Sequence, residues 1–501
     1  MKKLATEKNV NILIFVLLVI QPFLEIYWLY HFDAINNLFV LSPSTVIRLF
    51  AFLLLLVIFI IDKKKYKGFI ILSSVFLIYS LMHHVFASNT KLYWSDSYSF
   101  IKEMFYIMRL AIPLYLIYIL SFFKIENKTI ESGFYISAYI FAGIMIITNI
   151  FMIAMPAYPY TDTVEGSIFG WFTAKQNGIF FEELATKGIF NSANQISGFL
   201  ILIFPILVYY LYKKFSIVKV VGIIITIISM LMLGTRVASW GLFIVMIIML
   251  GIYVFLGLVK KEQIEKNLIV ANVLILLFAG TLFMFSPLQL RSSQVKEPSG
   301  EVENIKVQMK IYLKFISGGN YFEKLDEIAG FVREVNWEFS VPTIFLDIYL
   351  PEEDPGFWLR YYLNTDYTKI GDYRNIQGAI MNATNNKYGE LKTCLFGFSH
   401  SATFDNGMYL ERDIIVQVFY VGIIGALIFI GPFIGVIVYS IYRVLKEREQ
   451  FNFENLTYIL ALGLTICVSL FSGNMLDIFI VTIPFAIISS LLINNLKTKK
   501  V

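Results

Sequence analysis

Apolar residues in this chain gather in runs of about 18–23 residues separated by short polar segments, and about 20 apolar residues in an α-helix cross a membrane core roughly 30 Å thick. A soluble protein with one large core would not repeat this run length so many times. The pattern predicts about twelve membrane-spanning helices. We place them at 10–30, 44–61, 68–86, 100–121, 133–154, 193–212, 217–234, 236–258, 267–286, 414–442, 456–472 and 475–495.

A long stretch between the ninth and tenth predicted spans has a different pattern. EVENIKVQMKIYLKFI, YFEKLDEIAGFVREV and RNIQGAIMNATNNKYG carry apolar residues at steps of three and four, which predicts amphipathic helices, and LPEEDPGFW is a turn-rich break. We expect an all-α polytopic membrane protein with a large, mostly helical extracytoplasmic loop domain. Residues 1–286 would form spans one to nine with an external loop near 155–192, 287–413 the loop domain, and 414–501 spans ten to twelve with a cytoplasmic tail.

Composition agrees with this fold class. The 501 residues are 57% hydrophobic and 15% charged, whereas soluble domains are about 25% charged. The net charge of +5 does not indicate a nucleic-acid partner, because the surplus lies in short loops on one side of the predicted membrane. Cys394 and Cys467 have no metal-binding spacing and form no disulfide framework. The apolar N-terminal stretch is long and lacks a small-residue cleavage site, so we interpret it as an uncleaved first span.

Basic residues alternate from loop to loop, which indicates the orientation. Short cytoplasmic loops carry an excess of Lys and Arg. With twelve spans, every basic segment falls on the same side, and both termini are predicted to be cytoplasmic. These segments hold Lys2, Lys3 and Lys8, residues 62–67, 124–128, Lys213, Lys214 and Lys219, 260–266, 443–449 and 497–500.

Nearly all charges within the predicted spans lie in the outer half of the membrane. They are Glu25, Arg48, Lys102, Glu103, Arg109, Arg236, Glu411, Arg412, Asp413 and Asp477. A charge inside a membrane costs about 2.5–3.5 kcal/mol at the centre of a span, so such residues are functional candidates. A transporter usually carries its polar site near the midplane between related halves, and we find neither feature. The outer placement favours a ligand whose head group lies at the outer surface.

The arginines among these candidates suggest what the head group contains. Guanidinium groups match phosphate oxygens with two parallel hydrogen bonds and stay charged when partly desolvated. The candidates for diphosphate binding are Arg48, Arg109, Arg236, Arg360 and Arg374. Structural alternatives exist for several charges: Arg48 could pair with Glu25, Lys102 and Glu103 could reach the membrane surface, and Arg109 or Arg236 could be interface anchors. His83 and His84 are expected at the interface.

The sequence lacks the motifs of metal-binding and nucleotide-binding sites. It contains no His/Cys cluster with metal spacing, no glycine-rich phosphate loop and no nucleotide-binding pattern. We therefore expect no metal and no cofactor. Energy for a reaction would come with the substrate, as in a lipid-linked sugar diphosphate.

Several motifs resemble the O-antigen ligase and polymerase superfamily of bacterial membrane enzymes. FNSANQISGFLILIFPIL at 190–207 resembles its Asn-containing entry to a span, and LMLGTRVASWGLFIVMII at 231–248 its G-[ST]-R turn. A large external loop follows. YRNIQGAIMNATNNKYGELKTCLFGFS resembles an Arg-led helix that runs to a glycine turn, and HSATFDNGMYLERDIIVQVFYVGIIGALIF the closing segment that begins at a histidine. The resemblance in architecture covers nearly the whole chain.

This resemblance implies site roles by position. The family arginine falls on Arg236, where it implies binding of the lipid diphosphate, and the loop histidine falls on His400, which implies a role near the acceptor or the diphosphate. Ligases commonly have Asn after the histidine, whereas Ser401 follows here. Glu411 and Asp413 resemble the entrance of capsule and exopolysaccharide polymerases. The spacing from Arg360 to Gly371 resembles a polymerase motif, and His400 could instead be a hydrogen-bonding loop residue.

The implied reaction is metal-independent glycosyl transfer at the outer leaflet of the bacterial plasma membrane. Arg236, with Arg109 or Arg48 and Arg374, would neutralise the leaving polyprenyl diphosphate. His400, or a carboxylate among Asp405, Glu411 and Asp413, would orient or deprotonate a sugar hydroxyl. Expected partners are polyprenyl-diphosphate-linked oligosaccharide, membrane lipids, a flippase and a chain-length regulator. Ligase-type transfer to another acceptor is the first alternative, and a flippase for the lipid-linked unit is the second.

Overall fold

The computed structural model describes residues 6–31, 42–62, 66–89, 98–158, 162–261, 264–294, 300–318, 324–404 and 410–497. Asp405 and the lysines at 2, 3, 63–65 and 499–500, named above, lie outside these residues. The chain divides into two compact units. Unit 1 comprises Met1–Val75, Met108–Gln294 and Phe429–Val501, and unit 2 comprises Phe76–Ile107 and Val295–Ile428.

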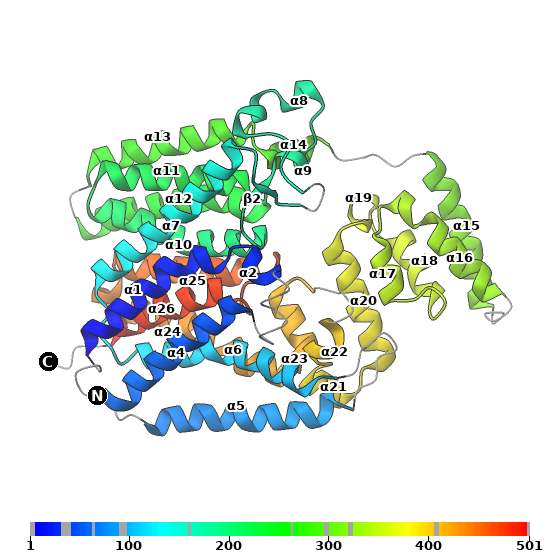
Figure 1. Cartoon of the computed structure of the whole chain (residues 1–501), viewed down its shortest axis with the longest axis horizontal. Coiled ribbons are helices and arrows are strands. Elements are labelled where there is room, and N and C mark those ends of the chain that lie inside the picture. Colours follow the sequence, from blue (N-terminus) through cyan, green and yellow to red (C-terminus); the bar gives the residue numbers. More distant parts are fainter. Residues whose placement is uncertain are drawn as a thin grey trace. The chain divides into compact units, whose positions relative to one another are not determined.

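Unit 1 is a bundle of long apolar helices with a small loop region (Figure 1). Its elements are α1 (Glu7–Leu24), α2 (Trp28–His31), α4 (Pro43–Asp62), α7 (Asn127–Ile150), β1 (Met155–Pro156), η1 (Ile168–Phe172), α8 (Ala174–Asn177), α9 (Phe181–Leu184), β2 (Thr186–Gly188), α10 (Ala193–Lys213), α11 (Ile217–Met232), α12 (Arg236–Lys260), α13 (Lys266–Phe283), α14 (Pro287–Ser293), α24 (Gly431–Lys446), η4 (Arg448–Gln450), α25 (Phe453–Ser469) and α26 (Phe479–Leu496). β1 and β2 pair antiparallel, with Met155 opposite Gly188.

Shorter helices make up most of unit 2. They are α15 (Gly300–Ser317), α16 (Leu325–Val335), η3 (Asn336–Phe339), α17 (Thr343–Ile348), α18 (Pro355–Asn364), α19 (Tyr367–Ile370), α20 (Tyr373–Tyr388), α21 (Leu391–Phe396) and α22 (His400–Phe404). Three helices are divided between the units along their length: α5 (Tyr66–Ala87), α6 (Phe100–Leu120) and α23 (Asp413–Phe429). α15, α16 and α20 lie where the three- and four-residue periodicity predicts amphipathic helices.

The spans agree with the predicted fold class. Within the described residues, ten helical runs are long and apolar enough to cross a membrane, and two shorter apolar helices, α11 and α25, lie at two further predicted spans. α23 and α24 count as one run, Asp413–Lys446. An all-α polytopic membrane protein is therefore confirmed, and the count of twelve stays a prediction.

α10 forms the core of unit 1 and packs against α7, α11, α12, α25 and α26. Its side chains are buried along almost the whole helix, from Ala193 to Tyr212. Outer helices such as α13 instead expose large apolar side chains, with Leu274 60% and Leu277 63% exposed. This radial pattern fits helices whose outer faces meet lipid, because a backbone hydrogen-bonded within each helix needs no water there.

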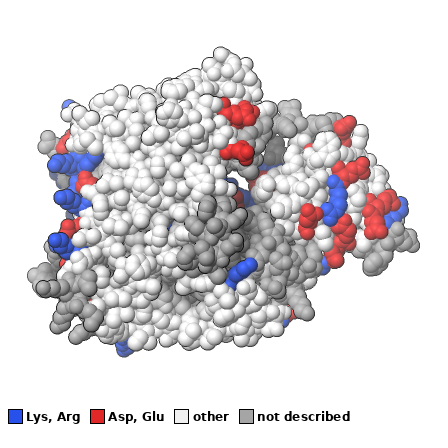
Figure 2. Space-filling model, in the orientation of Figure 1, with Lys and Arg blue, Asp and Glu red and all other residues white. Residues whose placement is uncertain are grey.

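The first and the last helix of the chain, α1 and α26, both contact the connection between α6 and α7 at one end of unit 1. Asn11 of α1 donates to the carbonyl of Lys124, and Asn494 of α26 donates to the carbonyl of Phe123. Figure 2 shows Lys and Arg side chains gathered at this left-hand end of unit 1, beside a broad surface with few charges. The positive-inside pattern predicts that this end of unit 1 is the cytoplasmic face.

Candidate functional site

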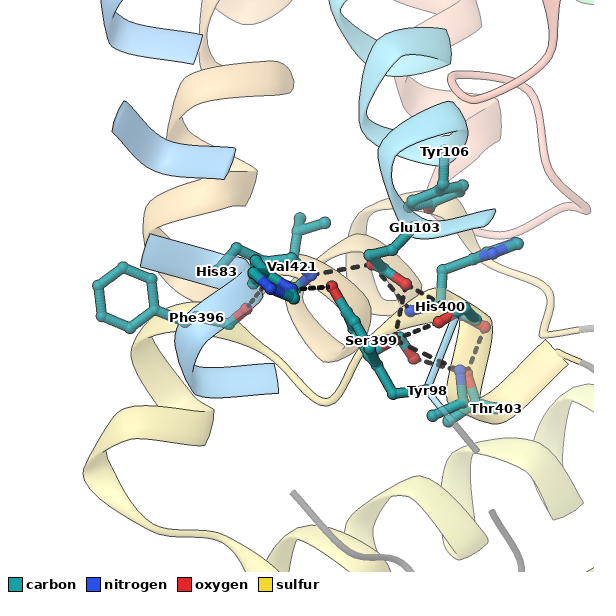
Figure 3. Close-up of polar contacts among 12 residues, drawn as sticks. His83, Tyr98, Glu103, Tyr106, Phe396, Ser399, His400, Thr403 and Val421 are labelled. Carbon is teal, nitrogen blue, oxygen red and sulfur yellow. Dashed lines mark hydrogen bonds and ion pairs between the residues drawn. The ribbon is translucent and has the colours of Figure 1, made fainter. Parts of the chain in front are cut away.

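A buried carboxylate, Glu103 of α6, is the centre of a polar cluster in unit 2 (Figure 3). Its Oε1 lies 2.9 Å from His83 Nε2 and accepts the backbone N–H of His400 at 3.2 Å. Its Oε2 accepts the Ser399 hydroxyl at 2.6 Å and the Ser401 backbone N–H at 2.7 Å. These donors compensate the carboxylate for the loss of water, which makes its burial tolerable.

The contacts of His83 determine where its protons lie. Its Nδ1 lies 2.6 Å from the carbonyl oxygen of Phe396, which can only accept, so Nδ1 carries a hydrogen. Nε2 faces Glu103 Oε1, and a bare nitrogen lone pair would repel a carboxylate oxygen. A hydrogen therefore lies between the two groups and joins them.

A break in α23 holds the segment before α22 in place. Gly422 has φ +68° and ψ 179°, which interrupts the helix at a residue that tolerates this conformation. The carbonyls of Phe419 and Tyr420 accept the backbone N–H groups of Phe398 at 2.8 Å and Ser399 at 3.1 Å. The glycine-rich motifs singled out in the sequence thus dock onto each other through their backbones.

The imidazole of His400 is oriented by aromatic rings. It stacks on Tyr106 with centroids 3.9 Å apart and planes 12° apart, and Tyr420 meets it edge-on at 5.1 Å. The Tyr106 hydroxyl donates to Gln417 at 2.8 Å, which fixes that ring in turn. His400 is half-buried, and Figure 3 shows its ring beside Tyr106. A positioned imidazole of this kind can accept a proton from a hydroxyl.

The predicted carboxylates beyond His400 differ in their surroundings. Glu411 is half-buried and pairs with Arg374 of α20, with Nε 2.5 Å from Oε2. Its backbone N–H donates to Gln377 at 2.9 Å. Asp413 is fully buried at the first position of α23. The structure thus brings Arg374 and Glu411 together as an ion pair, which partly neutralises both groups.

Arg236 lies at the first position of α12 in unit 1 and is exposed. The structure gives its side chain no ion pair or hydrogen bond with any described residue. Thr235 caps the helix, accepting from the Ala238 backbone N–H at 3.3 Å, and its hydroxyl lies 2.7 Å from that of Ser197 on α10. A cation at a helix N-terminus opposes the helix dipole, so this end favours an anion from outside the chain.

A second arginine reaches the same turn and was missed by the sequence reasoning. Arg291 of α14 donates to the Tyr158 hydroxyl at 3.0 Å, and that hydroxyl donates to the carbonyl of Gly234 at 3.2 Å. The guanidinium lies 5.1 Å from the ring centroids of both Tyr158 and Phe181. Arg291 follows the ninth predicted span by a few residues, a position at which the side chain of an arginine commonly reaches the membrane surface.

Arg48 is committed to protein partners. It is 3% exposed and forms an ion pair with Glu25, 2.5 Å away, as the structural alternative predicted. It also donates to Gln21, at 2.7 and 3.1 Å, and to Ser44. Its donors are used inside the bundle, so we do not assign Arg48 to the lipid diphosphate.

Arg109 of α6 also has a carboxylate partner. Its Nη2 lies 3.2 Å from Oδ2 of Asp477, which is 4% exposed in the non-helical segment between α25 and α26. The other oxygen of Asp477, Oδ1, is buried and has no hydrogen-bond partner in the described structure. Arg360 of α18 is exposed in unit 2, 3.9 Å from Asp354.

One structural alternative for the Glu103 cluster was wrong. Glu103 could have reached the membrane surface, yet its side chain is completely buried, as is that of His83. The signal was present in the sequence, because a carboxylate and a histidine occupy apolar helices. Their mutual contact joins residues 20 positions apart on separate helices, which periodicity does not reveal.

Comparison with protein families gives a match over residues 7–308 and 373–499, to O-antigen ligase like membrane proteins. The chain belongs to this family. No curated protein sequence matches the chain. The family assignment confirms the resemblance read from the motifs and places the protein among membrane proteins of O-antigen-related polysaccharide biosynthesis, whose substrates are lipid-linked glycans. Among the described residues, no group of three or more His, Cys, Asp or Glu side chains could hold a metal ion.

Proposed function

We propose that this protein is a polysaccharide polymerase that joins polyprenyl-diphosphate-linked repeat units at the outer leaflet of the bacterial plasma membrane. The observation that carries the proposal is Arg236, an exposed cation at a helix N-terminus without a carboxylate partner among the described residues. Such an end binds phosphate oxygens through both its charge and its backbone N–H groups. Arg291, joined to the same turn through Tyr158, supplies a second guanidinium for the diphosphate.

In this proposal His400 receives the proton of the acceptor. A hydroxyl oxygen of the incoming sugar attacks the anomeric carbon of the growing glycan. The bond between that carbon and the diphosphate oxygen breaks, and the electron pair leaves with the lipid diphosphate. The hydroxyl proton passes to His400, whose ring is held by Tyr106 and whose backbone is held by Glu103. Arg236 stabilises the charge that develops on the leaving group.

The carboxylates have supporting roles in the proposal. Glu411 is paired with Arg374, and we assign this pair to sugar positioning rather than to proton transfer. Asp413 is completely buried at the first position of α23, and we assign it a structural role at the start of that helix. We assign the ion pair between Arg109 and Asp477 a structural role in unit 1.

A reconstitution experiment tests the function. Purified protein in proteoliposomes receives lipid-linked repeat units, and the products are separated by size. A ladder of products longer than one repeat unit supports a polymerase. Transfer restricted to an added lipid-core acceptor would instead identify a ligase, and unchanged substrate carried to the opposite leaflet would identify a flippase.

A further inference from the structure

A cavity of about 610 Å³ lies in unit 2, between α18 and α20. Its size is within the range of about 300–1,000 Å³ that is typical of small-molecule sites. Its lining residues recur at helical spacing on the facing sides of the two helices. They are Phe357, Arg360, Tyr361 and Asn364 of α18, Ala379, Asn382, Ala383, Asn386 and Lys387 of α20, and Tyr349, Asp354 and Thr365 beside them.

Three asparagine amides give this groove its hydrogen-bonding capacity. Asn364, Asn382 and Asn386 are exposed, and the described structure shows no hydrogen bond formed by their side chains. Each amide offers donors on nitrogen and an acceptor on oxygen, which matches the neighbouring hydroxyls of a sugar ring. Asn382 and Asn386 are one helical turn apart, so both point from the same side of α20.

Aromatic rings and small residues provide the apolar part. The hydroxyls of Tyr349 and Tyr361 donate to Asp354 at 3.0 Å and to the carbonyl of Ile370 at 2.8 Å, and both side chains are buried beneath the cavity. Phe357 is half-buried, so it is the ring of Phe357 that offers aromatic surface to a ligand. Burial raises the pKa of both phenols, which keeps these hydroxyls protonated as donors. Ala379 and Ala383 add little bulk on the opposite side.

We propose that this groove is a glycan-binding subsite that holds sugar residues of the polymer or of the incoming repeat unit. The proposal rests on the proposed function for the identity of its ligand. Aromatic faces with adjacent amides suit the two sides of a sugar ring, apolar C–H groups and hydroxyls. Arg360, Lys387 and Asp354 in the lining suit a neutral or acidic sugar better than a basic one.

The groove lies partly outside the ranges of the chain that the family comparison matches. α18 lies between the two ranges matched by the family, whereas α20 begins where the second range resumes. One wall is thus shared with the family and the other belongs to the intervening segment. We infer that the groove selects which repeat unit is elongated.

Binding of the repeat-unit oligosaccharide, released by mild acid from lipid-linked material, tests the groove directly. Full-length protein in nanodiscs is titrated by saturation-transfer NMR. The double variant Asn382→Ala/Asn386→Ala is expected to bind at least about tenfold more weakly, because two amides that contact hydroxyls are lost. Ala383→Phe, which fills the cavity, is expected to abolish binding. Asn385→Ala is the matched control, an exposed asparagine of the same helix that does not line the groove.

Kinetics separate this proposal from the proposed function. In the elongation assay the double variant is expected to raise KM about tenfold with kcat unchanged, the signature of lost ground-state binding. If wild-type protein elongates glycans and the groove variants match Asn385→Ala in both assays, the groove proposal is overturned while the polymerase stands. If the groove variants lose binding but wild-type protein forms no ladder, the groove stands and the polymerase falls.

Discussion

Arg48 and Arg236, both in unit 1, show two opposite ways of keeping an arginine at a membrane helix. Arg48 is 3% exposed, and Glu25, Gln21 and Ser44 all accept from its guanidinium. Arg236 is exposed at the start of α12, and the described residues offer it no acceptor. The sequence places both charges at similar depth. The predicted depth of a charge in the membrane identifies it as a candidate. Its hydrogen-bonding partners then decide whether the charge stabilises the fold or binds a ligand.

Removing Arg48 should cause the largest loss of stability. Arg48→Ala leaves Glu25 as a buried carboxylate without its cation, at a cost of about 3–5 kcal/mol. Thermal unfolding in detergent should show a large fall in Tm. The double variant Arg48→Met/Glu25→Gln removes both charges and is expected to recover much of this loss. An Arg48→Ala protein as stable as wild type would contradict the structural role.

Removing Arg236 should affect activity and leave stability unchanged. Arg236→Ala is expected to lower kcat about 10²–10³-fold, the usual cost of losing one preorganised group that stabilises developing charge. Arg236→Lys should recover part of the rate, since a point charge lacks the two-pronged geometry. Arg333→Ala, which breaks an exposed pair with Glu352 in unit 2, serves as the control. Chain elongation at the wild-type rate by Arg236→Ala would end the assignment.

Glu103 should link folding and activity in unit 2. Glu103→Gln keeps the size but places an NH₂ group among donors, with an expected cost of about 1.5–3 kcal/mol for hydrogen bonds to a charged group. Displacement of His400 should lower kcat on the order of 10²-fold. Tm and kcat are measured together, with Glu334→Gln on the exposed side of α16 as the control. A variant with normal kcat would show that Glu103 does not position His400.

The smallest effect is expected at the cap of α12. Thr235→Ala removes an N-cap hydrogen bond, which costs about 1 kcal/mol, and frays the turn that presents Arg236. Ser216→Ala at the N-cap of α11 is the matched control, because its side chain forms no capping bond. A modest fall in both Tm and kcat for Thr235→Ala, absent in Ser216→Ala, would support this role. Equal behaviour of the two variants would argue against it.

Part of the proposed site was identified from the sequence. Arg236 was singled out by its place at the outer end of a predicted span and by the family resemblance, and the resemblance alone implied His400. Glu103, His83 and Arg291 could not be assigned this way. The Ser399 bond to Glu103 joins residues 296 positions apart, and the Phe396 bond to His83 joins residues 313 positions apart. No local pattern encodes such a pairing.

The sequence by itself determined the class of protein, the approximate positions of its long apolar helices and the candidates for binding a charged ligand. It could do so because hydrocarbon thickness fixes the length of an apolar helix and because a charge in lipid is costly wherever it occurs. Only the tertiary structure decided that Arg48 is neutralised, that Arg236 is exposed without a described partner, and that Glu103 holds the backbone of His400. Partner choice depends on which helices pack together, and packing is a property of the whole fold.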